Sequence, residues 1–155
     1  MLFGAAALAL LSGTATACAA SPPPPEVDEL AAQLDRARAD SQLATDAAAA
    51  TPPPPAAQAL TAVASERSAH AQALSDALVR MVGKNAPTTT STSTTAAPAN
   101  APSTDDVIAA LRQSADSAAQ LAAKQSGYRA GLLGSIAASC TAAYTVALVP
   151  AKAAQ

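Results

Sequence analysis

The chain of 155 residues has no tryptophan, one phenylalanine, two tyrosines, two cysteines and one histidine. Alanine supplies 47 residues, so most of the apolar content consists of single methyl groups rather than large side chains. Burying a large aliphatic side chain is worth roughly 1.5–3 kcal/mol, whereas ordering each residue costs roughly 1–2 kcal/mol. A chain with so few large apolar side chains cannot stabilise a sizeable enzyme domain, a β-sandwich or a β-barrel.

Charge is also sparse. Nine basic and eleven acidic residues are spread along the chain without blocks of one sign. Binding to nucleic acid or to an anionic membrane surface needs clustered Lys and Arg, so we expect neither. With one histidine, two cysteines and no Gly-rich phosphate loop, the sequence also predicts no enzymatic activity and no cofactor.

The first 17 residues have the composition of an export signal. They carry no charge, and an apolar run at residues 2–11 leads into small residues before Cys18. The run is too short to cross a bilayer, which takes about 20 residues. Two cleavages are open: a general signal peptidase could cut after Ala17, or Ala15-Thr16-Ala17-Cys18 could act as a lipobox and make Cys18 the acylated N-terminus.

Two proline runs divide the next part of the chain. Residues 18–25 form a Cys plus polyproline tether, because four consecutive prolines favour a stiff polyproline II spacer. Residues 26–84 are predicted to form a helical hairpin whose turn is residues 52–55, with Gly83 as the C-cap of its second helix. Apolar residues recur at helical spacing in both helices. They are Val27, Leu30, Leu34, Ala37, Ala44 and Ala48 in the first, and Leu60, Val63, Ala64, Ala71, Leu74, Leu78 and Met81 in the second.

Residues 85–102 contain Thr, Ser, Ala and Pro but no large apolar side chain. Such a segment cannot bury enough surface to order itself, so we expect a disordered linker. In an exported protein its threonines are also candidates for O-glycosylation.

Residues 103–150 are predicted to complete the bundle as one helix or a helix pair. Ser103 and Asp106 have the spacing of a capping box. One unbroken helix would be about 67 Å long, so we expect a kink or break near Gly127 to Gly134. The close spacing of Gly127, Gly131 and Gly134 suggests that a neighbouring helix approaches this part of the chain closely. The predicted fold is all-α, an antiparallel bundle of three long helices, with a four-helix bundle as the alternative.

Glu66 and His70 are the weak candidates for a metal site. They lie four residues apart on the second predicted helix, close enough for a hydrogen bond or a shared metal. Di-iron bundles use four carboxylates and two histidines, which this chain does not repeat. We therefore interpret the two residues as a structural pair at the edge of the bundle, with Arg67 on the polar side of the helix.

Cys140 follows Ile136 on the apolar face of the last helix, so it is predicted to be a small buried residue. A disulfide to Cys18 and an intermolecular bridge are the alternatives. Residues 131–149 carry no charge, which raises a transmembrane interpretation beside that of a bundle helix.

Three strings of sequence carry a resemblance to a known group. They are Ser21-Pro22-Pro23-Pro24-Pro25-Glu26-Val27-Asp28-Glu29-Leu30, Ser65-Glu66-Arg67-Ser68-Ala69-His70-Ala71 and Ser126-Gly127-Tyr128-Arg129-Ala130-Gly131-Leu132-Leu133-Gly134-Ser135. The chain resembles small, alanine-rich actinobacterial exported proteins of unknown function, mycobacterial ones especially. The resemblance implies a lipoprotein or membrane-associated protein with a ferritin-like fold. Because the ferritin ligands are missing here, it implies no di-iron chemistry.

The sequence thus predicts an exported, non-enzymatic helical bundle, tethered to the cell envelope through Cys18 and acting as an interaction or scaffold module. We expect its partner to be another envelope protein or a second copy, with the lipid anchor as the contact with the membrane. One alternative is a metal-binding or ferritin-like enzyme bundle that uses Glu66 and His70. The other is an integral membrane protein anchored by residues 131–149.

Overall fold

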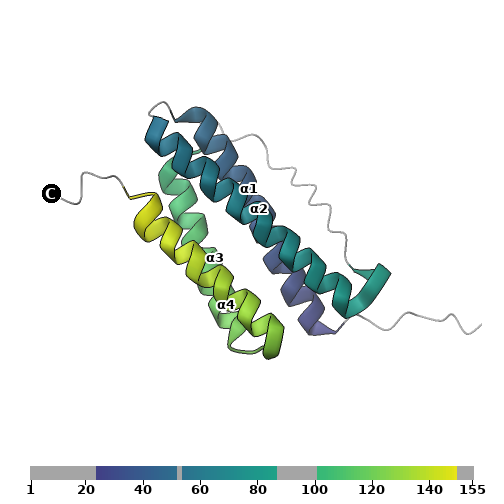
Figure 1. The fold of residues 1–155 in the computed structure, drawn as a ribbon. Coiled ribbons are helices and arrows are strands. Elements are labelled where there is room, and N and C mark those ends of the chain that lie inside the picture. Colours follow the sequence, from purple (N-terminus) through teal and green to yellow (C-terminus); the bar gives the residue numbers. More distant parts are fainter. Residues whose placement is uncertain (1–23, 52–53, 87–100, 150–155) are drawn as a thin grey trace, which may run out of the picture.

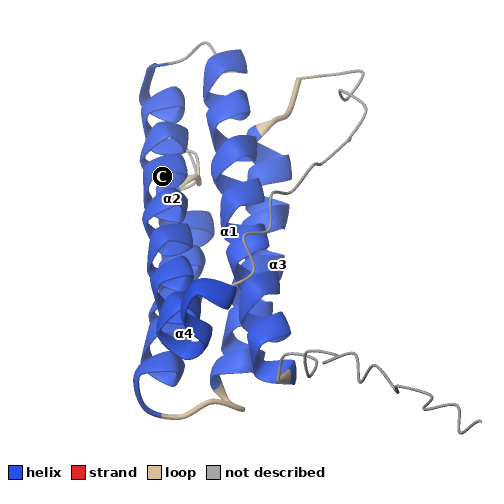
Figure 2. Ribbon diagram, turned by 90° about the vertical axis from the view of Figure 1, so that its right-hand side faces the viewer, coloured by secondary structure: helices blue, strands red, loops and turns tan. Residues whose placement is uncertain are grey.

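The computed structural model describes residues 24–51, 54–86 and 101–149, and these form an all-helical bundle (Figures 1 and 2). The four helices are α1 (Pro25–Ala50), α2 (Pro54–Val82), α3 (Thr104–Ala122) and α4 (Gly127–Ala142). A 3-10 turn at Gly83–Asn85 follows α2, and a π-helical turn at Ala143–Ala147 extends α4. The predicted signal at residues 1–17, Cys18 and most of the predicted linker, residues 87–100, lie outside the described residues.

Sequence signals explain where the helices begin and end. Pro25 is at the first position of α1, where a missing N–H costs nothing, and Glu26 and Asp28 follow in the first turn. The predicted capping box at α3 is confirmed, because Ser103 N donates to Asp106 Oδ2 at 2.8 Å and Asp106 N donates to Ser103 Oγ at 3.3 Å. At the end of α2, Gly83 adopts a φ of 61°.

The helices pair as two hairpins, α1 with α2 and α3 with α4 (Figure 1). Ion pairs from Glu29 to Lys124 at 3.5 Å and from Glu26 to Arg129 at 3.7 Å put the start of α1 beside the α3–α4 junction. The Arg80 guanidinium lies 4.7 Å from the ring centre of Tyr128, so the end of α2 is at this end too. The end of α2 and the start of α3 therefore lie at opposite ends of the bundle, and the segment between them connects the two ends.

The C-terminal region is broken into two helices, so the four-helix alternative describes the bundle. α3 ends at Ala122, and α4 begins at Gly127, whose φ is 56°. Left-handed backbone of this kind suits glycine because a Cβ would clash with the neighbouring carbonyl. Gly127 is the residue that allows the chain to reverse between the helices.

The expected close approach at Gly131 and Gly134 is wrong. Both glycines are exposed, and a Cβ built on either would meet nothing within 4 Å. They share helical spacing with Gly127, but they point away from the rest of the bundle.

These glycines give a matched pair of substitutions. Gly127→Ala is expected to lower the free energy of unfolding by about 1–2 kcal/mol, because alanine is strained at positive φ. Gly131→Ala is expected to raise it by about 0.5–1 kcal/mol, because alanine favours the helix and the space is open. Urea unfolding of both variants measures the difference, and a stabilising Gly127→Ala would contradict the described turn.

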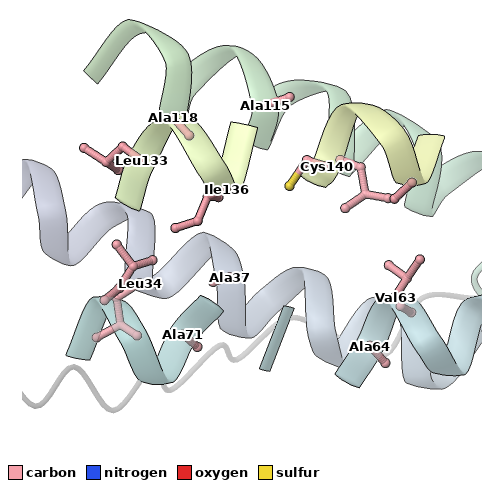
Figure 3. Close-up of a cluster of buried hydrophobic side chains, with 14 of the residues drawn as sticks. Leu34, Ala37, Val63, Ala64, Ala71, Ala115, Ala118, Leu133, Ile136 and Cys140 are labelled. Atoms are coloured by element: carbon pink, nitrogen blue, oxygen red, sulfur yellow. The ribbon is translucent and has the colours of Figure 1, made fainter. Parts of the chain in front are cut away.

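The core consists of a few large side chains set among alanines. The largest side chains that are fully buried are Leu30, Leu34, Leu60, Leu74, Leu78, Leu111, Leu133 and Ile136. Alanines such as Ala37, Ala44 and Ala118, none of them exposed, fill the positions between. In Figure 3, Ile136 and Cys140 extend from α4 toward the α1–α2 hairpin, where Leu34 and Ala37 of the same core cluster lie. Small side chains let the helices approach closely, so a chain with few large residues still forms a continuous core.

Candidate functional site: a polar seam between two helical hairpins

A charged pair lies inside the bundle. Asp40 on α1 and Arg67 on α2 have side chains that are 8% and 3% exposed. Arg67 Nη2 lies 3.0 Å, and Arg67 Nε 3.1 Å, from Asp40 Oδ2. On α3, Ser114 donates its hydroxyl to the same oxygen at 2.6 Å. Three helices therefore meet at one carboxylate. Its charge is compensated by the Arg67 guanidinium and by the hydrogen bond from Ser114.

Small neighbours make room for this pair. Asp40 is three residues after Ala37 and four before Ala44, and both alanines are fully buried. Arg67 is likewise four residues after Val63 and four before Ala71, on the buried face of α2. The expectation that Arg67 lies on the polar side of the helix is wrong, because it is 2% exposed. An acid and a base that each interrupt an apolar stripe were the signal that could have identified the pair.

Two further bonds join the hairpins. Gln33 on α1 donates to Ser117 Oγ on α3 at 2.6 Å, and Ser139 on α4 donates to Glu66 Oε1 on α2. The bond from Ser114 to Asp40 is a third contact of this kind. In each of the three, a serine of the α3–α4 hairpin forms a hydrogen bond with a polar side chain of the α1–α2 hairpin. We call these six residues the polar seam: Gln33, Asp40, Glu66, Ser114, Ser117 and Ser139. Hydrogen bonds have a fixed geometry, so the seam sets how the two hairpins register against each other.

His70 extends the seam on α2. Its Nδ1 lies 3.1 Å from Arg67 Nη1, and the guanidinium can only donate, so the imidazole nitrogen accepts. Burial and then the charge of Arg67 lower the pKa of His70, while the nearby Glu66 carboxylate acts in the opposite direction. The histidine is therefore held in its neutral form.

Glu66 and His70 lie near each other as predicted, but their hydrogen bonds go to other residues. Glu66 accepts from Ser139, and His70 accepts from Arg67. Within residues 24–51, 54–86 and 101–149, no three His, Cys, Asp or Glu side chains form a group that could hold a metal ion.

The prediction of a buried Cys140 is confirmed. Among the residues that the structure describes, the thiol has no disulfide partner, and Cys18 lies outside them. Cys140 is 1% exposed, and burial is the main cause that raises the pKa of its thiol. A protonated, inaccessible thiol is a poor nucleophile. In this state Cys140 contributes packing beside the seam.

Comparison of the chain with models of protein families, with curated proteins and with solved structures finds no match.

Proposed function

We propose that the protein is an exported, non-enzymatic helical bundle that is tethered to the cell envelope through Cys18 and acts as an interaction or scaffold module. Its partner is another envelope protein or a second copy of the chain. The sequence before Pro24 supports export and attachment. The outer surface of the last helix is the observation that carries the interaction role.

That surface has little charge and is little buried. The helix at Gly127–Ala147 has a mean hydropathy of 1.4 in an 18-residue window, of which 28% is buried. Small residues cover much of its exposed side: Gly131, Gly134, Ser135, Ala138, Thr141, Ala142 and Thr145. We call these seven residues the outer face of α4 and its π-helical extension.

The hydroxyls on the outer face are already bonded within the helix. Ser135, Thr141 and Thr145 donate to the carbonyls of Leu132, Ala137 and Thr141 at 2.7, 2.8 and 2.6 Å. A partner that covers this face therefore does not need to supply acceptors for them. Uncharged surfaces of small residues suit close packing against another helix, which supports the scaffold proposal.

The position of the tether fits this arrangement. Glu26, close to the first described residue, pairs with Arg129 at the start of α4. A tether that runs from Cys18 thus meets the bundle at the end where α4 begins. Membrane attachment at Cys18 would hold the outer face near other envelope proteins.

The helix at Gly127–Ala147 is also long and apolar enough to cross a membrane, by length and composition only. Its inner side, however, contributes Leu133, Ile136 and Cys140 to the core. Insertion across a bilayer would remove these side chains from α1, α2 and α3 and expose apolar surface there to water. The packing favours a bundle helix over the anchor at residues 131–149.

The connectivity of the bundle supports a ferritin-like arrangement of the four helices. α1 and α2 form one antiparallel pair, and one long crossover leads to α3 and α4, as in bundles of that type. A metal-binding function would require ligands from a partner chain beside Glu66 and His70. Metal analysis of the purified protein distinguishes that alternative from the scaffold proposal.

Attachment is tested by Cys18→Ala. If Cys18 is acylated, the wild-type protein partitions into the detergent phase of a membrane extract. The variant is expected to be released in soluble form or to remain uncleaved. Immunoblots of membrane and soluble fractions measure the change, with Cys140→Ala as a matched control that stays in the membrane fraction. A mature wild-type N-terminus without lipid, seen by mass spectrometry, would contradict the tether.

A further inference from the structure

Arg67 is shared between an acid and a base. Its Nε and Nη2 contact Asp40, and its Nη1 lies 3.1 Å from His70 Nδ1. A guanidinium always carries its proton and has no acceptor, so the contact with His70 requires a free lone pair on Nδ1. The contact exists only while the imidazole is neutral.

Protonation of His70 would put two donors and two positive charges face to face. Arg67 cannot turn to water to avoid the repulsion, because its side chain is 3% exposed and is bonded to Asp40. Movement of Arg67 would also remove a partner of Asp40, whose carboxylate holds Ser114 of the second hairpin. Protonation of His70 therefore weakens the contact between the hairpins in two steps: it displaces Arg67, and Asp40 then loses the partner that holds it in position for Ser114.

The surroundings do not neutralise a second cation. From α1, Asp40 is already bonded to Arg67 and Ser114. On α2, Glu66 is the carboxylate that favours protonated His70, but burial and Arg67 act more strongly against it. From α4, the buried Cys140 thiol supplies no compensating charge because burial keeps it protonated. On α3, the group at this point is the neutral Ser114 hydroxyl.

We propose that the contact between His70 and Arg67 is an acid-sensitive switch, in which protonation of His70 loosens the polar seam and separates the α1–α2 hairpin from the α3–α4 hairpin. His70 is half-buried, so protons can reach it from solvent. The switch is a property of the bundle itself and does not depend on tethering or on a partner.

Cys140 reports on the opening, since it is 1% exposed beside the seam. In a Cys18→Ser background, the labelling rate of Cys140 by a disulfide reagent is divided by the rate for the unfolded chain at the same pH. This ratio measures the opening constant. The labelling ratio is expected to rise between pH 7 and pH 5, because a proton binds His70 more tightly in the open state than in the closed state. Each unit of difference between the pKa of His70 in the two states raises the opening constant by up to about tenfold.

Two substitutions isolate the histidine. His70→Gln keeps an acceptor for Arg67 without a titratable group, so its labelling ratio should not change between pH 7 and pH 5. His70→Lys carries a permanent charge and should have, at pH 7, the labelling ratio that the wild type has at pH 5. If the wild type and His70→Gln respond equally to pH, the switch is disproved. This comparison decides the question even if His70→Lys does not fold.

Discussion

Arg67→Ala is expected to lower the free energy of unfolding by about 3–5 kcal/mol. The substitution leaves Asp40, whose side chain is 8% exposed, as a buried charge without its guanidinium partner. It also removes the side chain that fills the space next to Ala71 on the inner face of α2. Because domains of this kind are stabilised by only about 5–15 kcal/mol, the loss is a large part of the total. Urea unfolding followed by circular dichroism measures it.

Two controls separate the charge effect from packing. The double variant Asp40→Leu with Arg67→Met replaces the pair by apolar groups, and it should recover most of the stability. Lys124→Ala breaks an ion pair with Glu29 in which the side chain of Lys124 is 66% exposed and that of Glu29 is 42% exposed. This variant should change the free energy of unfolding by no more than about 1 kcal/mol. An Arg67→Ala variant as stable as Lys124→Ala would mean that the pair is not buried.

Leu111→Ala is expected to cost about 2–5 kcal/mol. Leu111 is fully buried on α3, and the core around it is built largely from alanines, which are too small to fill the space that would be left. The loss therefore combines the burial of the removed atoms with the energy of a cavity.

Val146→Ala is the control for this prediction. Val146 is 75% exposed, so its truncation should change the free energy of unfolding by no more than about 0.5 kcal/mol. Chemical unfolding of both variants gives the comparison. Equal effects at the two positions would show that α3 does not pack as described.

The helices could be predicted from local chemistry. Proline runs, the box formed by Ser103 and Asp106, and leucines at helical spacing all act through residues close in sequence. These signals give the all-helical class and the ends of α1 and α2. They carry no information on how one hairpin crosses to the other, so the arrangement of four helices needed the structure.

The buried pair shows why the polar seam could not be read from periodicity. A hydrophobic pattern assigns a charged residue to the solvent side, and on that basis Arg67 was expected to be exposed. The cost of burying Arg67 is offset by Asp40, which is 27 residues away in sequence, and by Ser114 on α3. The sequence shows only that a charged residue interrupts each apolar stripe, and not which distant residue compensates its charge.

Glycine spacing was ambiguous for a similar reason. Gly127, Gly131 and Gly134 have the spacing of a helix contact, yet the space around Gly131 and Gly134 is open. Only the backbone conformation distinguishes Gly127, which reverses the chain, from the two glycines on the outer face. Cys140 was easier to predict, because its neighbours along the helix, Ile136 and Ala143, are apolar.

Cross-linking in the native envelope tests most directly whether the outer face of α4 contacts a partner. A photoreactive residue is placed at Ala138 on the outer face or at Ala62 on α2, since both alanines are exposed. The proposal predicts one discrete adduct from position 138 and none from position 62. Equal cross-linking from both positions, or none from position 138, would contradict it.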